Sequence, residues 1–111
     1  MKTIKSKQDF HGVFSEGKRI SRSTMRVIYR QTQSSEPRLA FCAPKRLGSA
    51  PLRNRCKRLL RQAVFQAPEL LQHYDLILFA TPRTPHHKSY ELSLDFQSIL
   101  HDINTRSCNM S

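Results

Sequence analysis

The sequence predicts an α+β fold, an α/β sandwich in which helices pack on a mixed β-sheet. Apolar residues recur at helical spacing in three segments, while the segments between them show the alternating or continuous apolar patterns of strands. The resulting order is helix, two or three strands, helix, strand, helix. A length of 111 residues suits one domain with a single core, so we expect residues 1–111 to form one domain.

The first predicted element is a short helix over residues 7–15. Ser6 is followed by an acid three residues later, which is the form of a capping box, and Gly17 supplies a stop. Phe10 and Phe14 lie one turn apart on the same face of this helix. That face is either part of the core or an open aromatic surface.

Residues 24–30 alternate in the manner of a half-buried strand. One face carries Met25, Val27 and Tyr29, and the other carries Arg26, Ile28 and Arg30. Residues 38–43 form the next predicted strand, joined to the first as an antiparallel hairpin by the polar loop 31–37. Residues 18–22 could form another short strand.

A loop at residues 44–48 leads into the central helix. Ser49 is a suitable N-cap and Pro51 falls in the first turn, where its missing N–H costs little. The predicted helix covers residues 50–66, and Pro68 ends it.

The last third of the chain predicts a strand and a helix. Residues 75–80, DLILFA, are continuously apolar after the first position, as in a strand buried on both faces. After a loop at 81–88, apolar residues from Leu92 to Ile103 hold helical spacing. Residues 105–111 are expected to be a frayed tail.

The charge is large and unevenly placed. The formal net charge is +11, and residues 1–68 hold sixteen cations against three acids. Between Glu36 and Glu69 there are eight cations and no acid. Such a one-sided field repels itself, and a polyanion relieves the repulsion, so nucleic acid is the first partner to consider.

The helix over 50–66 concentrates this charge. Its core stripe consists of Leu52, Cys56, Leu59, Leu60 and Ala63, and beside it lies an arc of Arg53, Asn54, Lys57, Arg58 and Arg61, with Arg55 on the other flank. Cations in the first turns oppose the helix dipole, and no acid within the helix compensates them. A bound phosphate would be attracted both by the positive end of the helix dipole and by the uncompensated cations. The arc therefore predicts a phosphate-binding surface.

Other classes of function fit less well. No apolar run approaches the length of a membrane span, and the helix's apolar stripe is needed for the core, so we expect no membrane partner. The eight acids are scattered, whereas two-metal nuclease chemistry needs clustered carboxylates. Three cysteines without a CxxC pair, and the adjacent His86 and His87, predict neither a disulfide framework nor a metal site.

The string RNRCKRLLRQA resembles the RNR signature of the protein subunit of bacterial ribonuclease P. Agreement extends to APKRLGSAPL just before it and to DFHGVFSEGKR near the N-terminus, and DLILFA stands where the family has its last strand. The resemblance covers residues 4–104. It implies an α-β-β-β-α-β-α order with a four-stranded mixed sheet, three helices and a left-handed β-α-β crossover, as in the second domain of ribosomal protein S5.

The resemblance also implies a function. In this family the RNA subunit is the catalyst and uses Mg²⁺ to remove the 5′ leader of precursor tRNA, and the protein binds that RNA and the leader. We therefore expect a cytoplasmic RNA-binding subunit in a 1:1 complex with the RNA subunit, with no cofactor of its own. A ribosomal or general RNA-chaperone protein is the alternative.

The family's functional positions carry over to this sequence. Binding to the RNA subunit is implied for Lys45, Arg46, Arg53, Asn54, Arg55, Lys57, Arg58 and Arg61. The leader cleft is implied to contain Phe10, Phe14, Arg26, Ile28 and Arg30. Two positions depart from the family pattern, since Ile28 replaces a frequent aromatic residue and Pro44 replaces a small polar one.

Overall fold

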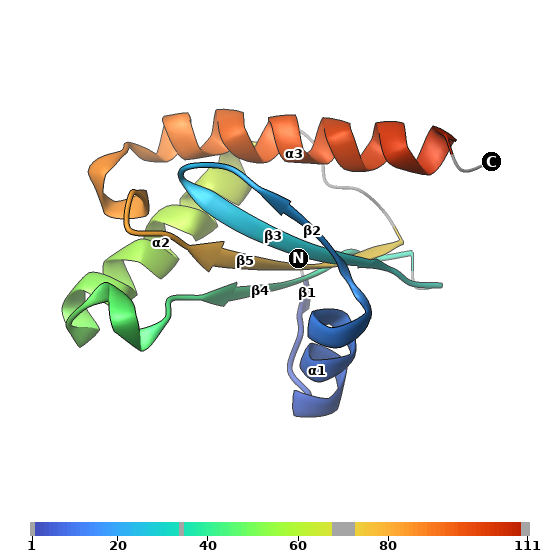
Figure 1. Ribbon diagram of the computed structural model, residues 1–111, viewed down its shortest axis with the longest axis horizontal. Helices are drawn as coiled ribbons and strands as arrows, with labels where there is room; N and C mark the ends of the chain where they lie inside the picture. The colour runs from blue at the N-terminus through green and yellow to red at the C-terminus, as the bar shows by residue number, and fades with distance from the viewer. Residues whose placement is uncertain (1, 34, 68–72, 110–111) are drawn as a thin grey trace.

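The computed structural model describes residues 2–33, 35–67 and 73–109 and shows one mixed sheet covered on both faces (Figure 1). The strands are β1 (Lys2–Thr3), β2 (Lys18–Ser21), β3 (Met25–Gln31), β4 (Arg38–Cys42) and β5 (Tyr74–Ala80). Their order across the sheet is β1-β4-β5-β3-β2. Four of these strands are the predicted ones, and the two-residue β1 adds a short edge beside β4 that the sequence pattern did not indicate.

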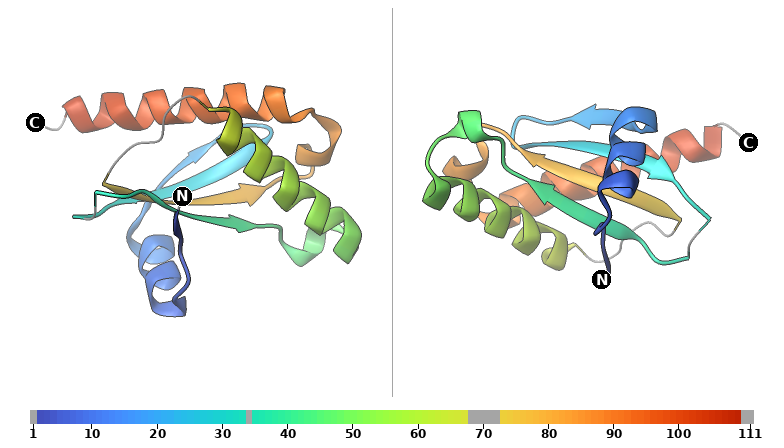
Figure 2. Two further views of the ribbon diagram at one scale, coloured as in Figure 1. Left: turned by 180° about the vertical axis from the view of Figure 1, so that it is seen from behind. Right: turned by 90° about the horizontal axis from the view of Figure 1, so that it is seen from below.

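Three helices form the two outer layers. They are α1 (Lys7–Glu16), α2 (Ala50–Gln66) and α3 (Ser89–Asn109), and two short 3₁₀ helices, η1 (Lys45–Leu47) and η2 (Thr84–His86), lie in the predicted loops. Helix α1 covers one face of the sheet, while α2 and α3 pack together on the other (Figure 2). The architecture is therefore the predicted α/β sandwich.

The predicted hairpin between the strands at 24–30 and 38–43 is wrong. Strand β5 lies between them, antiparallel to β3 and parallel to β4. At its centre Ile77 is level with Ile28 on one side and Ala40 on the other. A strand that is apolar on both faces gains most from burial in the middle of the sheet, because most of its apolar surface is removed from water there, so β5 displaces the local pairing. The hairpin that does form joins β2 to β3.

Helix α3 runs to Asn109 and so includes residues 105–109 of the predicted tail. Residues 110 and 111, the remainder of that predicted tail, lie outside the described part of the chain. Residues 105–109 can join α3 at little cost, because each residue added to an existing helix forms one further backbone hydrogen bond.

Strands β4 and β5 with the intervening α2 form the crossover unit. Viewed from the α1 side with both strands pointing upward, β5 lies to the right of β4 and α2 lies behind the sheet (Figure 2, right). This arrangement is left-handed, as the resemblance implies and against the usual preference for such units.

The sheet separates two apolar clusters. The larger lies beneath α2 and α3 and includes Met25, Val27, Tyr29, Leu60, Leu76, Leu78, Phe96 and Ile99. The smaller lies beneath α1 and consists of Val13, Ile28, Ala40 and Ile77, with Phe10, Phe79, Ile4 and Cys42 packed against it. The alternation predicted for residues 24–30 is confirmed, since successive side chains of β3 enter different clusters.

Both predicted N-caps are present. The Ser6 hydroxyl oxygen accepts from the backbone N–H groups of Gln8 and Asp9, and the Ser49 hydroxyl oxygen accepts from that of Leu52. Asp9 does not complete a capping box. Its carboxylate instead accepts from Arg38 Nη1 at 2.9 Å, on strand β4.

An ion-pair network ties α1 to the sheet around Asp75, which is fully buried. Arg38 donates to both carboxylate oxygens of Asp75, at 2.9 and 2.7 Å. Arg30 lies 3.6 Å from the same carboxylate and 3.4 Å from Glu16 on α1. The hydrogen bond with Asp75 raises the pKa of Arg38 further above its ordinary value.

We predict that Asp75→Asn destabilises the fold by about 2 kcal/mol, because two partly buried guanidinium groups lose their carboxylate partner. The control is Glu16→Gln, whose side chain is 73% exposed and should change stability by less than about 0.5 kcal/mol. Urea unfolding followed by circular dichroism measures both. Equal stability of Asp75→Asn and the wild type would show that the network contributes nothing to the fold.

Candidate nucleic-acid interface

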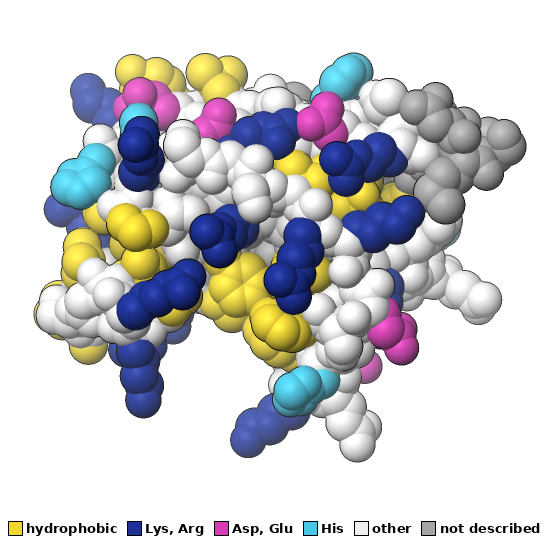
Figure 3. All heavy atoms as spheres, viewed as in Figure 1, with side chains coloured by type: hydrophobic (Ala, Val, Ile, Leu, Met, Phe, Trp, Pro, Cys, Tyr) yellow, Lys and Arg dark blue, Asp and Glu magenta, His cyan; other side chains and the backbone are white. Residues whose placement is uncertain are grey.

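An open groove of about 530 Å³ runs between α1, the sheet and η1. Its lining consists of Phe14, Arg19, Ser21, Arg26, Val27, Ile28, Pro44, Arg46, Phe79 and Ala80. Figure 3 shows this part of the surface as an apolar hollow above α1 with Lys and Arg side chains around it. The groove thus joins an apolar floor to a cationic rim.

Two aromatic rings, those of Phe14 and Phe79, line the groove, and the Phe10 ring lies next to Phe14 outside the lining. The Phe10 and Phe14 rings are near-parallel with centroids 6.4 Å apart, and Phe14 meets Phe79 edge-on at 6.1 Å. Phe14 remains 40% exposed, whereas Phe10 is half-buried. The face containing the two phenylalanines is therefore both core and open surface, with Phe14 as the open member.

Three arginines line the groove together with the exposed Phe14 ring. The Arg19 guanidinium carbon lies 5.3 Å above the centre of the Phe14 ring, a cation–π distance. Arg26 comes from β3 and Arg46 from η1, and both are exposed. Arg46 was assigned by resemblance to the RNA-subunit surface, and the structure places it on the rim of the groove as well.

Two residues assigned to the leader cleft, Phe10 and Arg30, are absent from the groove lining. Ile28 does line the groove, yet it is only 5% exposed because it packs beneath α1 in the smaller apolar cluster. Arg30 is held by Glu16 and Asp75 and is absent from the groove lining. Arg26, four residues before Arg30 on the same face of β3, is the β3 cation that lines the groove.

Helix α2 places its row of cations along β4. Arg53 Nε donates to the Ala43 carbonyl oxygen at 3.0 Å, and the Arg61 guanidinium lies 5.6 Å above the Phe41 ring. Lys57 lies between them in this row. Arg53 and Arg61 therefore help to hold α2 against β4 and its following residue, and they also add positive charge to the surface of the helix.

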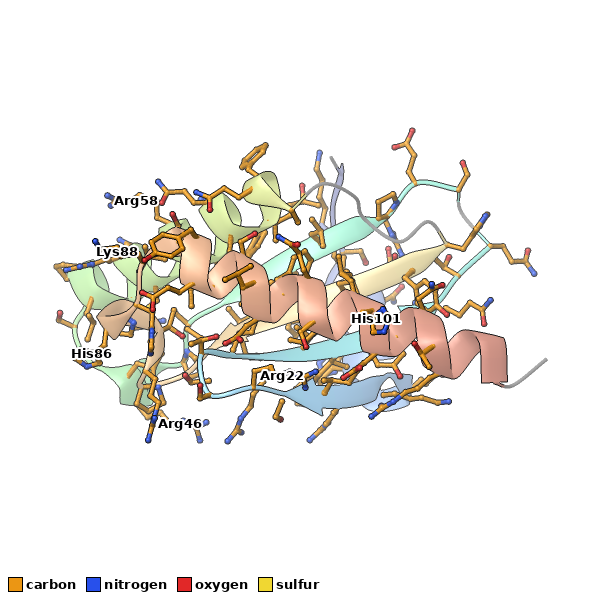
Figure 4. All side chains as sticks on the ribbon, turned by 90° about the horizontal axis from the view of Figure 1, so that it is seen from above. Arg22, Arg46, Arg58, His86, Lys88 and His101 are labelled. Atoms are coloured by element: carbon orange, nitrogen blue, oxygen red, sulfur yellow. The ribbon has the colours of Figure 1, made fainter. Side chains whose placement is uncertain are left out.

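The other predicted RNA-subunit residues point to solvent. Asn54, Arg55 and Arg58 on α2 and Lys45 on η1 are exposed. Figure 4 shows Arg58 projecting from α2 and Arg46 at the end of the molecule where α2 begins. Groove rim and helix surface are thus contiguous through η1, which leads directly into α2.

Burial raises the pKa of the Cys42 and Cys56 thiols, against weaker opposition from Lys57 and Arg55. Within residues 2–33, 35–67 and 73–109, no three His, Cys, Asp or Glu side chains gather where they could hold a metal ion. No helix in the same ranges is long and apolar enough to cross a bilayer.

Sequence reasoning missed Arg19 and Phe79. Arg19 belongs to residues 18–22, for which the sequence pattern indicated only a possible strand, so the face of the sheet on which its side chain lies could not be assigned. Phe79 was grouped with a fully buried strand, yet Asp75, Ile77 and Phe79 share the α1 face of β5 by alternation. The position of Phe79 at the end of that face leaves its ring partly exposed in the groove.

Comparison with known proteins identifies the family. The model of the protein family described as Ribonuclease P matches residues 1–104. The chain belongs to the ribonuclease P protein family. Relatives named ribonuclease P protein component are 38% identical over 79 residues in Bacillus velezensis, covering 69% of this chain and 67% of that protein, and 33% identical over 85 residues in Nitrosococcus oceani, covering 76% and 71%.

Solved ribonuclease P proteins share the fold. The Staphylococcus aureus protein superposes with a TM-score of 0.76 at 21% identity, covering 94% of this chain and 95% of that one. The Thermotoga maritima protein gives 0.78 at 18% identity, with coverages of 90% and 96%. The three helices and mixed sheet described above are therefore those of ribonuclease P proteins.

Gly17 lets α1 approach the sheet closely enough to form the groove. A Cβ at this position would lie 2.4 Å from the Val13 carbonyl oxygen and 2.9 Å from that of Tyr29. We predict that Gly17→Ala shifts α1 away from β3 and destabilises the protein by ~1–3 kcal/mol. Urea unfolding measures the loss, and NMR shifts of the Phe14 and Phe79 rings report the displacement.

Gly12→Ala is the matched control for this substitution. A Cβ at Gly12 meets only the end of the Arg30 side chain and no backbone atom. Any cost is therefore confined to the contacts of Arg30 with Glu16 and Asp75 and leaves the spacing of α1 from the sheet unchanged, and alanine favours the helix by up to about 1 kcal/mol. Unchanged ring shifts in Gly17→Ala would contradict the close-approach role of Gly17.

Proposed function

We propose that this chain is the RNA-binding protein component of ribonuclease P and assists the RNA subunit in removing the 5′ leader from precursor tRNA. The supporting observation is the continuity of two surfaces. A groove suited to a single strand opens beside η1, and an acid-free cationic helix begins where η1 ends. One chain can thereby hold two RNAs next to each other.

The groove would bind the leader. An unpaired base can stack on the open Phe14 ring, and Arg19, Arg26 and Arg46 stand where they can bind the phosphates on either side. The ring surface accepts any base, whereas a helical duplex keeps its bases stacked inside. This preference favours a single-stranded leader over the folded body of tRNA.

The surface of α2 would bind the RNA subunit. Asn54, Arg55, Lys57 and Arg58 project along it, and its dipole adds positive potential at the N-terminal end. Neutralised phosphates on both RNAs reduce the repulsion between them. In this proposal the RNA subunit carries the Mg²⁺ and the catalysis, in a 1:1 complex that works in the cytoplasm, and the protein contributes binding.

Reconstitution with the bacterial RNA subunit tests the proposal. At a Mg²⁺ concentration where that RNA alone cleaves slowly, we expect the protein to stimulate cleavage of a precursor with a 5′ leader. The measurement is the single-turnover rate with and without protein. A general RNA chaperone would instead stimulate unrelated ribozymes equally, so equal stimulation of a hammerhead ribozyme would contradict the specific role.

We predict that Phe14→Ala in the holoenzyme weakens binding of precursor tRNA about tenfold and leaves binding of mature tRNA unchanged, since only the precursor has a base to stack on this ring. Phe65→Ala is the matched control, because Phe65 is 73% exposed on α2 and does not line the groove. Filter binding with the two tRNAs measures both variants. An equal loss for precursor and mature tRNA would exclude the groove as the leader site.

A further inference from the structure

A second pocket, separate from the groove, lies where α2 begins. It has a volume of about 430 Å³, within the range of small-ligand sites. Its lining consists of Leu47, Leu52, Arg55, Cys56, Thr81, Pro82, Pro85 and His86. Figure 4 shows His86 at this end of the molecule, on the same side as Arg46.

The wall formed by residues 81–86 is held rigidly. The Thr81 N–H donates to the Thr84 hydroxyl oxygen at 2.8 Å, and that hydroxyl donates to the Thr24 carbonyl oxygen at 2.6 Å. The Thr81 hydroxyl donates to the Ser23 carbonyl oxygen at 2.7 Å. Both threonines are buried, so this short turn is fastened to the β2–β3 hairpin and its two prolines are fixed in place. The pocket is thus formed before any ligand arrives.

The chemistry of the pocket fits a flat, partly apolar ligand. Leucine and proline side chains make its sides, and the two polar side chains at its mouth, Arg55 and His86, are both planar and exposed. Among the described residues, the Arg55 guanidinium has no hydrogen-bond or salt-bridge partner. A guanidinium plane is a good stacking surface for a nucleobase, and apolar side chains tolerate the other face of the base.

The surroundings of the pocket favour a nucleotide over a peptide. The two elements that supply Leu47, Leu52 and Arg55 to the pocket, η1 and α2, also carry Lys45, Arg46, Arg53 and Arg58, and neither element contains an acid. A base that enters the pocket brings its neighbouring phosphates to this acid-free, cationic end of the molecule. An acidic peptide would also neutralise the positive charge, but its acidic side chains have no flat ring to stack on Arg55 and to contact the apolar walls of the pocket.

We propose that this pocket receives one unpaired base of the RNA subunit, which stacks on Arg55 and inserts between the leucine and proline walls. The proposal rests on the proposed function and adds to it, because it makes Arg55 a base-stacking residue and not only a phosphate contact. One inserted base would fix where along the RNA subunit α2 docks, which phosphate contacts alone do not do.

Charge-preserving substitutions separate stacking from phosphate contact. Arg55→Lys retains the charge and loses the plane, so we expect it to weaken binding of the RNA subunit about tenfold without changing the salt dependence of binding. Arg58→Lys, on the exposed arc outside the pocket, should stay within about twofold of the wild type. Filter binding across a salt series measures affinity and slope, and circular dichroism verifies that each variant is folded.

Photocrosslinking identifies the base. With p-benzoylphenylalanine in place of His86, ultraviolet irradiation of the reconstituted complex should crosslink one unpaired nucleotide. An abasic substitution at that nucleotide should weaken binding of the wild type as much as Arg55→Lys does. Combining the two changes should cost no more than either alone, because both remove the same contact.

Three results would overturn the proposal: wild-type affinity for Arg55→Lys, crosslinks spread over base-paired regions, or additive losses for the two changes. Each of these leaves stimulation of precursor cleavage intact and so does not affect the proposed function. Absence of stimulation by the wild-type protein would instead contradict the proposed function itself.

Discussion

Burial of β5 on both faces is the constraint on which the rest of the structure depends. Leu76 and Leu78 enter the cluster beneath α2 and α3, while Ile77 enters the cluster beneath α1. This double burial requires a strand on each side and a helical layer above and below. The α1 face of β5 ends at Phe79, where cover from α1 runs out, so the core continues directly into the floor of the groove.

Charge is neutralised where α1 must dock and left free where RNA would bind. Beneath α1, Asp75 and Glu16 hold Arg30, and Asp75 and Asp9 hold Arg38. Helix α2 and the 3₁₀ helix before it have no acid, whereas α3 carries three. The resulting field is directed outward from α2 and the groove rim. Because this face has no compensating charge of its own, a polyanion gains the full attraction.

The element types were largely predictable, and the site only in part. Helical and strand periodicities located every α-helix and every strand except the two-residue β1, but not the two short 3₁₀ helices, and both serine caps were recognised. The hairpin prediction failed because local order favours pairing neighbours in sequence, whereas burial of β5 favours placing it between β3 and β4. The same limit applies to Arg30 in the site. Alternation correctly placed Arg30 on the same face of the strand as Arg26, but only the structure shows that its guanidinium is paired with Asp75.

By itself the sequence determined the layers, the excess of cations on one helix and the family to which the chain is similar, because these depend on residue type and local spacing. The tertiary structure alone decided which cations are free, which aromatic ring is open and that a rigid pocket lies beside Arg55. These features arise where segments distant in the chain meet, as Phe14, Arg19 and Phe79 do in the groove. Contacts between segments so far apart in the chain depend on how the whole sheet is buried, and a local sequence pattern does not specify them.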